Sequence, residues 1–256
     1  MEKLLKSNLF IRTFSASILG LIFIYALLFS HNLFLSIAIL IIVLSFVELS
    51  KIIELDRYDI LRNLLYGSIF LFLFLNFPYF FKLYITVFFI FICPLVVIRK
   101  INFSLFYRYL PCTYLPSFFV AIFYLLNENS MFLLTIFLGI WSVDIGGYFF
   151  GRLFGRNKLF PITSPKKTYE GLIGSCLSLI VILIIMNLKY SLFSHATLFS
   201  IFLLILIFSV FGDYFESYLK RRFNVKDSGY LIPGHGGILD RVDSALFAIP
   251  IIYIIL

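Results

Sequence analysis

The run SHATLFSIFLLILIFSVFG at residues 194–212 decides the fold class, because it is apolar over almost its whole length. A helix that crosses a bilayer needs roughly 20 mostly apolar residues. The run leads into residues 211–244, FGDYFESYLKRRFNVKDSGYLIPGHGGILDRVDS, which hold ten of the chain's 34 charged residues. An apolar helix followed by a charged, glycine-rich stretch indicates a membrane protein with a functional segment at the edge of the bilayer.

Composition extends this interpretation to the whole chain. The 256 residues are 62% hydrophobic and 13% charged, with a mean hydropathy of +1.05, and soluble domains usually carry about a quarter charged residues. The apolar runs are 13–30, 32–47, 63–77, 83–98, 109–126, 130–150, 171–188, 194–212 and 242–256. We therefore predict an all-α polytopic integral membrane protein with about 8–9 transmembrane helices, of which the last is short for a full span.

The positive charge follows the predicted topology. With an inner N-terminus and nine spans, 19 of the 21 Lys and Arg residues fall in the inner segments, which are 1–12, 48–62, 99–108, 151–170 and 213–241. This distribution obeys the positive-inside rule, so the net charge of +8 gives no reason to expect a nucleic-acid partner. We expect a multi-pass cell-membrane protein whose N-terminus and loops 151–170 and 213–241 are cytoplasmic.

Asp144 is the first candidate for chemistry, because it lies inside an apolar run about two turns from the cytoplasmic end. An ionisable side chain within a span is costly, and it is by default a functional hypothesis. The alternative is a structural aspartate held by hydrogen bonds. For Gly146 and Gly147, which follow it, we favour close helix packing, since small residues let membrane helices approach each other.

A second cluster, SPKKTYEG at residues 164–171, leads into the next predicted span. Either Ser164 or Thr168 is suited to cap that helix. Paired lysines beside the free N–H groups of a helix start favour phosphate binding. The alternative is that Lys166 and Lys167 serve only as topology determinants.

The third cluster combines carboxylates, basic residues and glycines. Asp213, Glu216 and Lys220 have i, i+3, i+7 spacing, and a helix would place them on one face. Asp240 and Asp243 form a second pair three residues apart. Among these carboxylates lie Lys220, Arg221, Arg222, Lys226 and Arg241, with Gly234-His235-Gly236-Gly237 as a flexible loop. Hard carboxylate oxygens suit Mg²⁺ better than zinc, and metal, amines and flexible backbone favour phosphoryl or nucleotidyl transfer. A solvated loop of ion pairs would explain the charges but not the glycines beside them.

The same residues resemble the motif of the phosphatidate cytidylyltransferase (CDP-diacylglycerol synthase) family over roughly residues 141–244. The matching segments are Lys220-Arg221, Lys226-Asp227-Ser228-Gly229, Pro233-Gly234-His235-Gly236-Gly237, Asp240-Arg241-Val242-Asp243, Gly212-Asp213…Glu216-Ser217, Asp144…Gly151-Arg152 and Ser164-Pro165-Lys166-Lys167-Thr168…Glu170-Gly171. The chain departs from the family at two sites: Tyr169 stands for a usual Trp, and Ile145-Gly146-Gly147 replaces a more usual Thr-Gly-Ala.

The resemblance implies a multi-spanning helical fold that transfers CMP from CTP to phosphatidic acid, giving CDP-diacylglycerol and pyrophosphate for phospholipid synthesis. It maps metal-binding carboxylates onto Asp213 and Asp240, with Asp243 adjacent. The expected metal is Mg²⁺, and a second cation is left open. Together, residues and resemblance predict a catalytic set of Asp144, Asp213, Lys220, Lys226, Asp240 and Asp243. The predicted substrate-binding set is Ser164, Lys166, Lys167, Thr168, Glu216, Ser217, Arg221, His235, Gly236, Gly237 and Arg241.

These assignments divide the chain into an N-terminal scaffold of transmembrane helices, residues 1–130, and a C-terminal catalytic region, residues 131–256. The expected partners are CTP, phosphatidic acid and the lipid bilayer, with a homodimer left open. Two alternatives remain: a CTP-dependent kinase or cytidylyltransferase for another membrane lipid, and an ion-coupled transporter. Paired broken helices in two related halves, which many carriers show, are not evident in the sequence.

Overall fold

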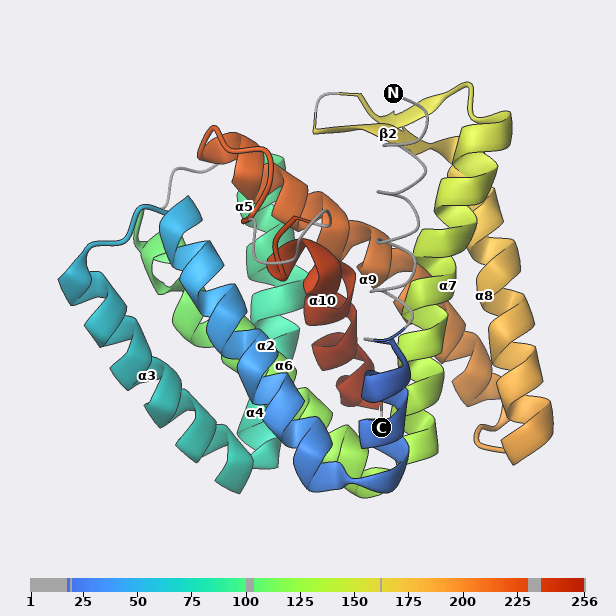
Figure 1. Cartoon of the computed structure of the whole chain (residues 1–256), viewed down its shortest axis with the longest axis horizontal. Coiled ribbons are helices and arrows are strands. Elements are labelled where there is room, and N and C mark those ends of the chain that lie inside the picture. The colour runs from blue at the N-terminus through green and yellow to red at the C-terminus, as the bar shows by residue number, and fades with distance from the viewer. Residues whose placement is uncertain (1–17, 19, 100–103, 162, 230–235, 256) are drawn as a thin grey trace.

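The apolar runs form long helices, as a chain in lipid requires, because a helix satisfies its own backbone hydrogen bonds. A computed structural model describes residues 18, 20–99, 104–161, 163–229 and 236–255. Its helices are α2 (His31–Ile52), α3 (Arg57–Asn76), α4 (Pro78–Ile85), α5 (Cys93–Arg99), α6 (Ser104–Glu128), α7 (Ser130–Phe154), α8 (Tyr169–Tyr190), α9 (His195–Arg222) and α10 (Leu239–Ile255). A π-helical segment, η1 (Thr86–Ile92), joins α4 to α5, and Figure 1 shows the bundle.

Seven helices in the described residues are long and apolar enough to cross a membrane. They correspond to the predicted runs from 32–47 to 194–212, so the all-α, polytopic prediction is confirmed. The first run, 13–30, lies partly outside the described residues, and its described part contains the helix Gly20–Phe29. The last run falls in α10, which has 17 residues.

Polar side chains fix where several helices begin. Asn129 Oδ1 accepts a hydrogen bond from Met131 N at 2.8 Å, and Asp56 Oδ1 accepts one from Asp59 N at 2.7 Å. Thr168 Oγ1 accepts from Gly171 N at 3.0 Å, so Thr168, one of the two predicted candidates, caps α8. Each cap pairs a first-turn N–H that would otherwise lack an acceptor.

Helix α10 lies in the interior of the bundle, against α2, α6 and α9 (Figure 1). Phe247 is fully buried, and its ring centroid lies 4.9 Å from that of Phe89, 5.0 Å from that of Phe211 and 5.7 Å from that of Phe215. This aromatic packing fixes α10 in the core. The buried core therefore fixes the position of the first turn of α10, and of its carboxylates, relative to α9.

Helices α7 and α8 pack side by side with little space between them (Figure 1). A Cβ atom at Gly146 would meet Gly174 O at 2.6 Å and would also collide with Ser178. Across the same contact, Ser175 Oγ donates to Val143 O at 2.6 Å. The prediction that Gly146 serves helix packing is thus confirmed. The close contact fixes the segment of α7 that carries Asp144 against α8 near Ser175.

A two-stranded antiparallel hairpin, β1 (Lys158–Phe160) and β2 (Ser164–Thr168), connects α7 to α8. The sequence analysis did not predict it. Lys158 pairs with Thr168, and Phe160 pairs with Ser164. The Phe160 ring centroid lies 4.3 Å from that of Tyr214, so the hairpin packs on α9. Lys167 of the hairpin reaches Asp213 on the same helix.

The predicted boundary near residue 130 falls between α6 and α7. One continuous hydrophobic core contains buried residues from both sides of it, including Leu49 and Leu115 on one side and Leu246 on the other. The division into scaffold and catalytic region remains a prediction.

Candidate active site

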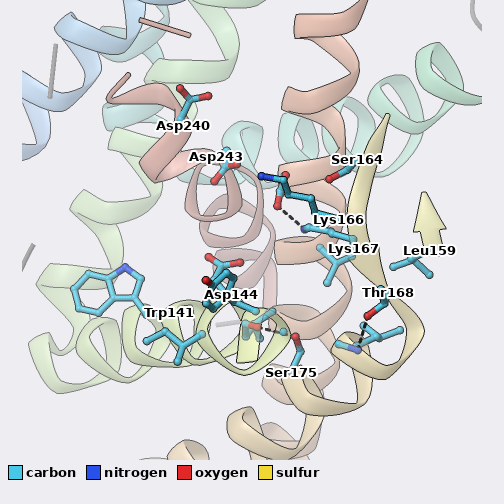
Figure 2. A pocket seen from close by; sticks show the side chains of 18 of the residues that line it. Trp141, Asp144, Leu159, Ser164, Lys166, Lys167, Thr168, Ser175, Asp240 and Asp243 are labelled. Atoms are coloured by element: carbon cyan, nitrogen blue, oxygen red, sulfur yellow. Dashed lines mark hydrogen bonds and ion pairs between the residues drawn. The ribbon is translucent and has the colours of Figure 1, made fainter. Parts of the chain in front are cut away.

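A cavity of about 630 Å³ lies where α7, the hairpin, α8, α9 and α10 meet (Figure 2). It is lined by members of all three clusters singled out in the sequence: Asp144, Ser164, Lys166, Lys167, Thr168, Asp213, Asp240, Arg241 and Asp243. Apolar side chains, including Trp141, Leu159 and Leu172, complete its wall. The fold thus brings segments about 100 residues apart in the sequence to one cavity, which has both charged and apolar walls.

Asp144 lies within the membrane-spanning part of α7, yet its side chain is accessible because it borders the cavity. Ser244 Oγ on α10 approaches Asp144 Oδ1 at 3.5 Å. Figure 2 shows Asp144 and Asp243 on the same cavity from two different helices. Asp144, Asp213 and Asp243 all line this cavity, so carboxylates from three helices face the same space.

Lys167 forms the contact between the second and third clusters. Its Nζ lies 2.5 Å from Asp213 Oδ2, and Ser217 Oγ approaches the other oxygen, Asp213 Oδ1, at 3.3 Å. Both side chains of the ion pair are about a quarter accessible. The Lys167 ammonium group therefore occupies a position beside Asp213 that also suits a metal ion.

Lys220 lies behind the cavity wall, between two acids. Its Nζ is 2.5 Å from Asp240 Oδ1 and 3.2 Å from Glu216 Oε1. Its side chain is 13% accessible and that of Glu216 is 4% accessible. In this arrangement Lys220 is an internal counterion for two carboxylates, and it is not among the residues that line the cavity.

The carboxylate of Asp240 organises the turn before α10. Its Oδ2 accepts hydrogen bonds from Ser228 N at 3.0 Å, Ser228 Oγ at 2.8 Å and Gly237 N at 3.1 Å. Burial alone would raise the pKa of Asp240, but the hydrogen bond and charge of Lys220, with the Ser228 hydrogen bonds, lower it to about 2. Gly236 has φ +87°, a left-handed conformation in which glycine carries no Cβ penalty.

The remaining predicted site residues are placed as follows. Arg221 and Lys226 are exposed, and neither lines the cavity. Gly236 and Gly237 form the turn before α10, outside the cavity lining. His235 lies in residues 230–235, outside the described residues.

Glu48, near the end of α2, was missed by the sequence analysis. It is 2% exposed and accepts hydrogen bonds from Ile238 N at 3.0 Å, Leu239 N at 2.8 Å and Ser228 Oγ at 3.1 Å. A single acid at the end of an apolar run was the available signal. Its partners lie 180 or more positions away, so local spacing could not identify them.

The helical bundle and its cavity, which is lined by aspartate, lysine and arginine side chains, define a polytopic membrane protein with a charged ligand-binding site. The cytidylyltransferase family model matches residues 10–256. The chain therefore belongs to the cytidylyltransferase family.

Individual relatives agree with this assignment. The chain is 44% identical over 133 residues to a phosphatidate cytidylyltransferase of Staphylococcus epidermidis, a match covering 51% of this chain and 50% of the relative. Proteins of the same name from Staphylococcus saprophyticus and Staphylococcus aureus are 45% and 44% identical over 131 residues, with the same coverage. In these alignments the chain spans about half the length of the curated relatives it matches.

Proposed function

We propose that this chain is a CTP:phosphatidate cytidylyltransferase, a nucleotidyltransferase that gives CDP-diacylglycerol and pyrophosphate. The observation that carries the proposal is the single cavity in which Asp144, Lys167, Asp213 and Asp243 meet. The name shared by the relatives, phosphatidate cytidylyltransferase, supports phosphatidate as the acceptor and a cytidine nucleotide as the donor. A volume of about 630 Å³ is within the usual range for small-ligand sites, roughly 300–1,000 Å³.

The electrostatics of the cavity support a reaction between anions that needs added cations. Four carboxylates line it, against three cationic side chains, Lys166, Lys167 and Arg241. A nucleoside triphosphate and a lipid phosphate would be repelled by this balance unless a metal ion entered with them. A phosphate monoester has a second pKa of about 6, so the attacking phosphate is largely dianionic at neutral pH and needs no strong base.

The carboxylates fit a hard divalent cation by their chemistry. Within the described residues, no group of three His, Cys, Asp or Glu side chains forms a ready-made metal site, but Mg²⁺ usually takes one or two carboxylates and keeps water and substrate phosphate. Asp213 and Asp243 are the proposed ligands, while Asp240, also predicted from sequence, has both oxygens engaged by Lys220, Ser228 and Gly237. When bound, Mg²⁺ would neutralise phosphate charge and polarise the reacting phosphoryl group. A second cation remains part of the proposal.

The cationic residues would then hold phosphates. Lys167 would exchange its contact with Asp213 for a phosphate oxygen when Asp213 takes the cation. Lys166 and the capped N-terminus of α8, beside Thr168, offer an ammonium group and backbone N–H groups on the same wall, a favourable setting for an anion. These contacts would align the lipid phosphate with the α-phosphorus of CTP and let pyrophosphate leave in line.

The apolar wall suits a lipid substrate. Trp141, Ile145 and Leu172 border the same cavity as the charged side chains. A phosphate head group could therefore reach the ions while its glycerol and acyl portions stay against apolar surface. We propose that this site opens on the cytoplasmic side of a bacterial plasma membrane, where CTP is available. The positive-inside pattern supports this orientation.

The test uses purified full-length protein in detergent micelles containing phosphatidate. Pyrophosphate release should require CTP, phosphatidate and Mg²⁺ together, and CDP-diacylglycerol should appear in equal amount. Asp144→Asn should lower the rate at least tenfold, because Asp144 borders the reacting groups, with the exposed Glu54→Gln as the charge-matched control. Pyrophosphate release that is independent of phosphatidate would overturn the proposal.

A further inference from the structure

Glu48 is a buried acid of the N-terminal half that touches the segment before α10. Both oxygens are engaged: Oε1 accepts from Ile238 N, and Oε2 accepts from Leu239 N and Ser228 Oγ. The first backbone N–H groups of a helix lack intrahelical acceptors and carry partial positive charge. The carboxylate of α2 thus serves as an external cap for α10.

The glycines of the turn fit closely around this carboxylate. A Cβ atom at Gly229 would lie 2.5 Å from Glu48 Oε1, and one at Gly237 would lie 2.6 Å from Glu48 Oε2. Such distances are too short for any real Cβ contact. At Gly237 a Cβ atom would also collide with Ser228 Oγ. Neither glycine position therefore has room for a side chain while Glu48 and Ser228 keep their places.

Ser228 connects Glu48 to Asp240, which lines the cavity. Its hydroxyl lies 3.1 Å from Glu48 Oε2 and 2.8 Å from Asp240 Oδ2. The turn that Glu48 and Asp240 hold together begins the helix that carries Arg241 and Asp243 into the cavity. A small rotation of this first turn would move Asp243 relative to Asp144 and Asp213, which are fixed on other helices.

We propose that Glu48 is a positioning residue for cytidylyl transfer: it sets the start of α10 and thereby the place of Arg241 and Asp243 in the cavity. Glu48 does not line the cavity and acts through the turn. The inference rests on the proposed function for its activity measurement, but its structural measurement does not.

The test compares Glu48→Gln with Glu54→Gln, which removes the same charge from an exposed side chain six positions along. Glutamine keeps the size of Glu48, but its amide NH2 is a donor. Either Ile238 N or Leu239 N therefore loses its acceptor. We expect pyrophosphate release per folded molecule to fall at least tenfold in Glu48→Gln and to stay within twofold of wild type in Glu54→Gln. Hydrogen–deuterium exchange should rise in the peptide covering residues 236–246 and stay unchanged in α7 and α8.

Equal turnover in the two variants, or increased exchange spread evenly over the bundle, would overturn the proposal. If Glu48→Gln does not fold, Ser228→Ala supplies the same comparison, because it removes only the hydroxyl between Glu48 and Asp240. Unchanged exchange at residues 236–246 and unchanged turnover in Ser228→Ala would also overturn it. If the wild type forms no pyrophosphate, the proposed function fails, while the exchange measurement still decides the role of Glu48.

Discussion

Replacing Lys220 with methionine tests whether this residue is an internal counterion, as its contacts indicate, or a phosphate ligand. The substitution keeps an unbranched side chain but removes the ammonium group that lies 2.5 Å from Asp240 and 3.2 Å from Glu216. Deleting one partner of a buried ion pair costs about 3–5 kcal/mol, because the other charge stays buried and unpaired.

The lower end of that range applies to Lys220→Met. Asp240 keeps its hydrogen bonds to Ser228 and Gly237, and the Lys220 side chain is 13% accessible. We therefore expect a loss of about 3 kcal/mol. For a chain of this size that corresponds to a fall in Tm of roughly 6–12 °C.

Thermal unfolding of the purified protein in detergent, followed by intrinsic fluorescence, measures this shift. Lys226→Met is the matched control, since Lys226 is exposed, and its Tm should stay within about 2 °C of wild type. Adding Glu216→Gln to Lys220→Met should recover part of the loss, because it removes an orphaned acid. A Tm for Lys220→Met equal to that of the control, with a raised KM for CTP, would refute the counterion role and restore that of a phosphate ligand.

Three further predictions address the cavity and its frame. Asp213→Asn should reduce pyrophosphate release by about 10²-fold or more and raise the Mg²⁺ concentration needed for half-maximal rate. An unchanged Mg²⁺ titration would show that Asp213 is not a metal ligand. Lys167→Met should raise the KM for CTP or phosphatidate by roughly 10- to 150-fold, because loss of one charged contact costs about 1.5–3 kcal/mol. An unchanged KM for both substrates would contradict phosphate binding. Gly146→Ala should destabilise the α7–α8 contact by about 1–3 kcal/mol through overpacking, seen as a lower Tm, with Gly20→Ala, where a Cβ meets nothing within 4 Å, as the control.

The transmembrane helices and the three polar clusters could be predicted because their signals are local. Apolar length marks a span, and a carboxylate such as Asp144 inside a span stands out against it. The helical spacing of Asp213 and Glu216 was likewise visible, and both lie on α9. The predicted inner segments 48–62, 99–108 and 151–170 include the connections between helices, whereas residues 213–222 belong to α9. The side of the membrane on which these segments lie stays a prediction.

Features that depend on distant partners could not be predicted. The spacing of Lys220 gave no way to tell a phosphate ligand from a counterion, because the answer lies in its distance to Asp240, 20 positions away. Glu48 belongs to the half of the chain that was predicted to be a scaffold, and its hydrogen bonds are with Ser228, Ile238 and Leu239. The hairpin at 158–168 is held by the packing of Phe160 on Tyr214, which no short motif encodes.

The most direct test of the central claim follows the fate of each phosphate of CTP. With phosphatidate and Mg²⁺, label at the α-phosphorus should enter the lipid fraction and label at the γ-phosphorus should leave as pyrophosphate. Transfer of the γ-label to lipid would identify a kinase, and no transfer of either label would show that the cavity does not perform cytidylyl transfer.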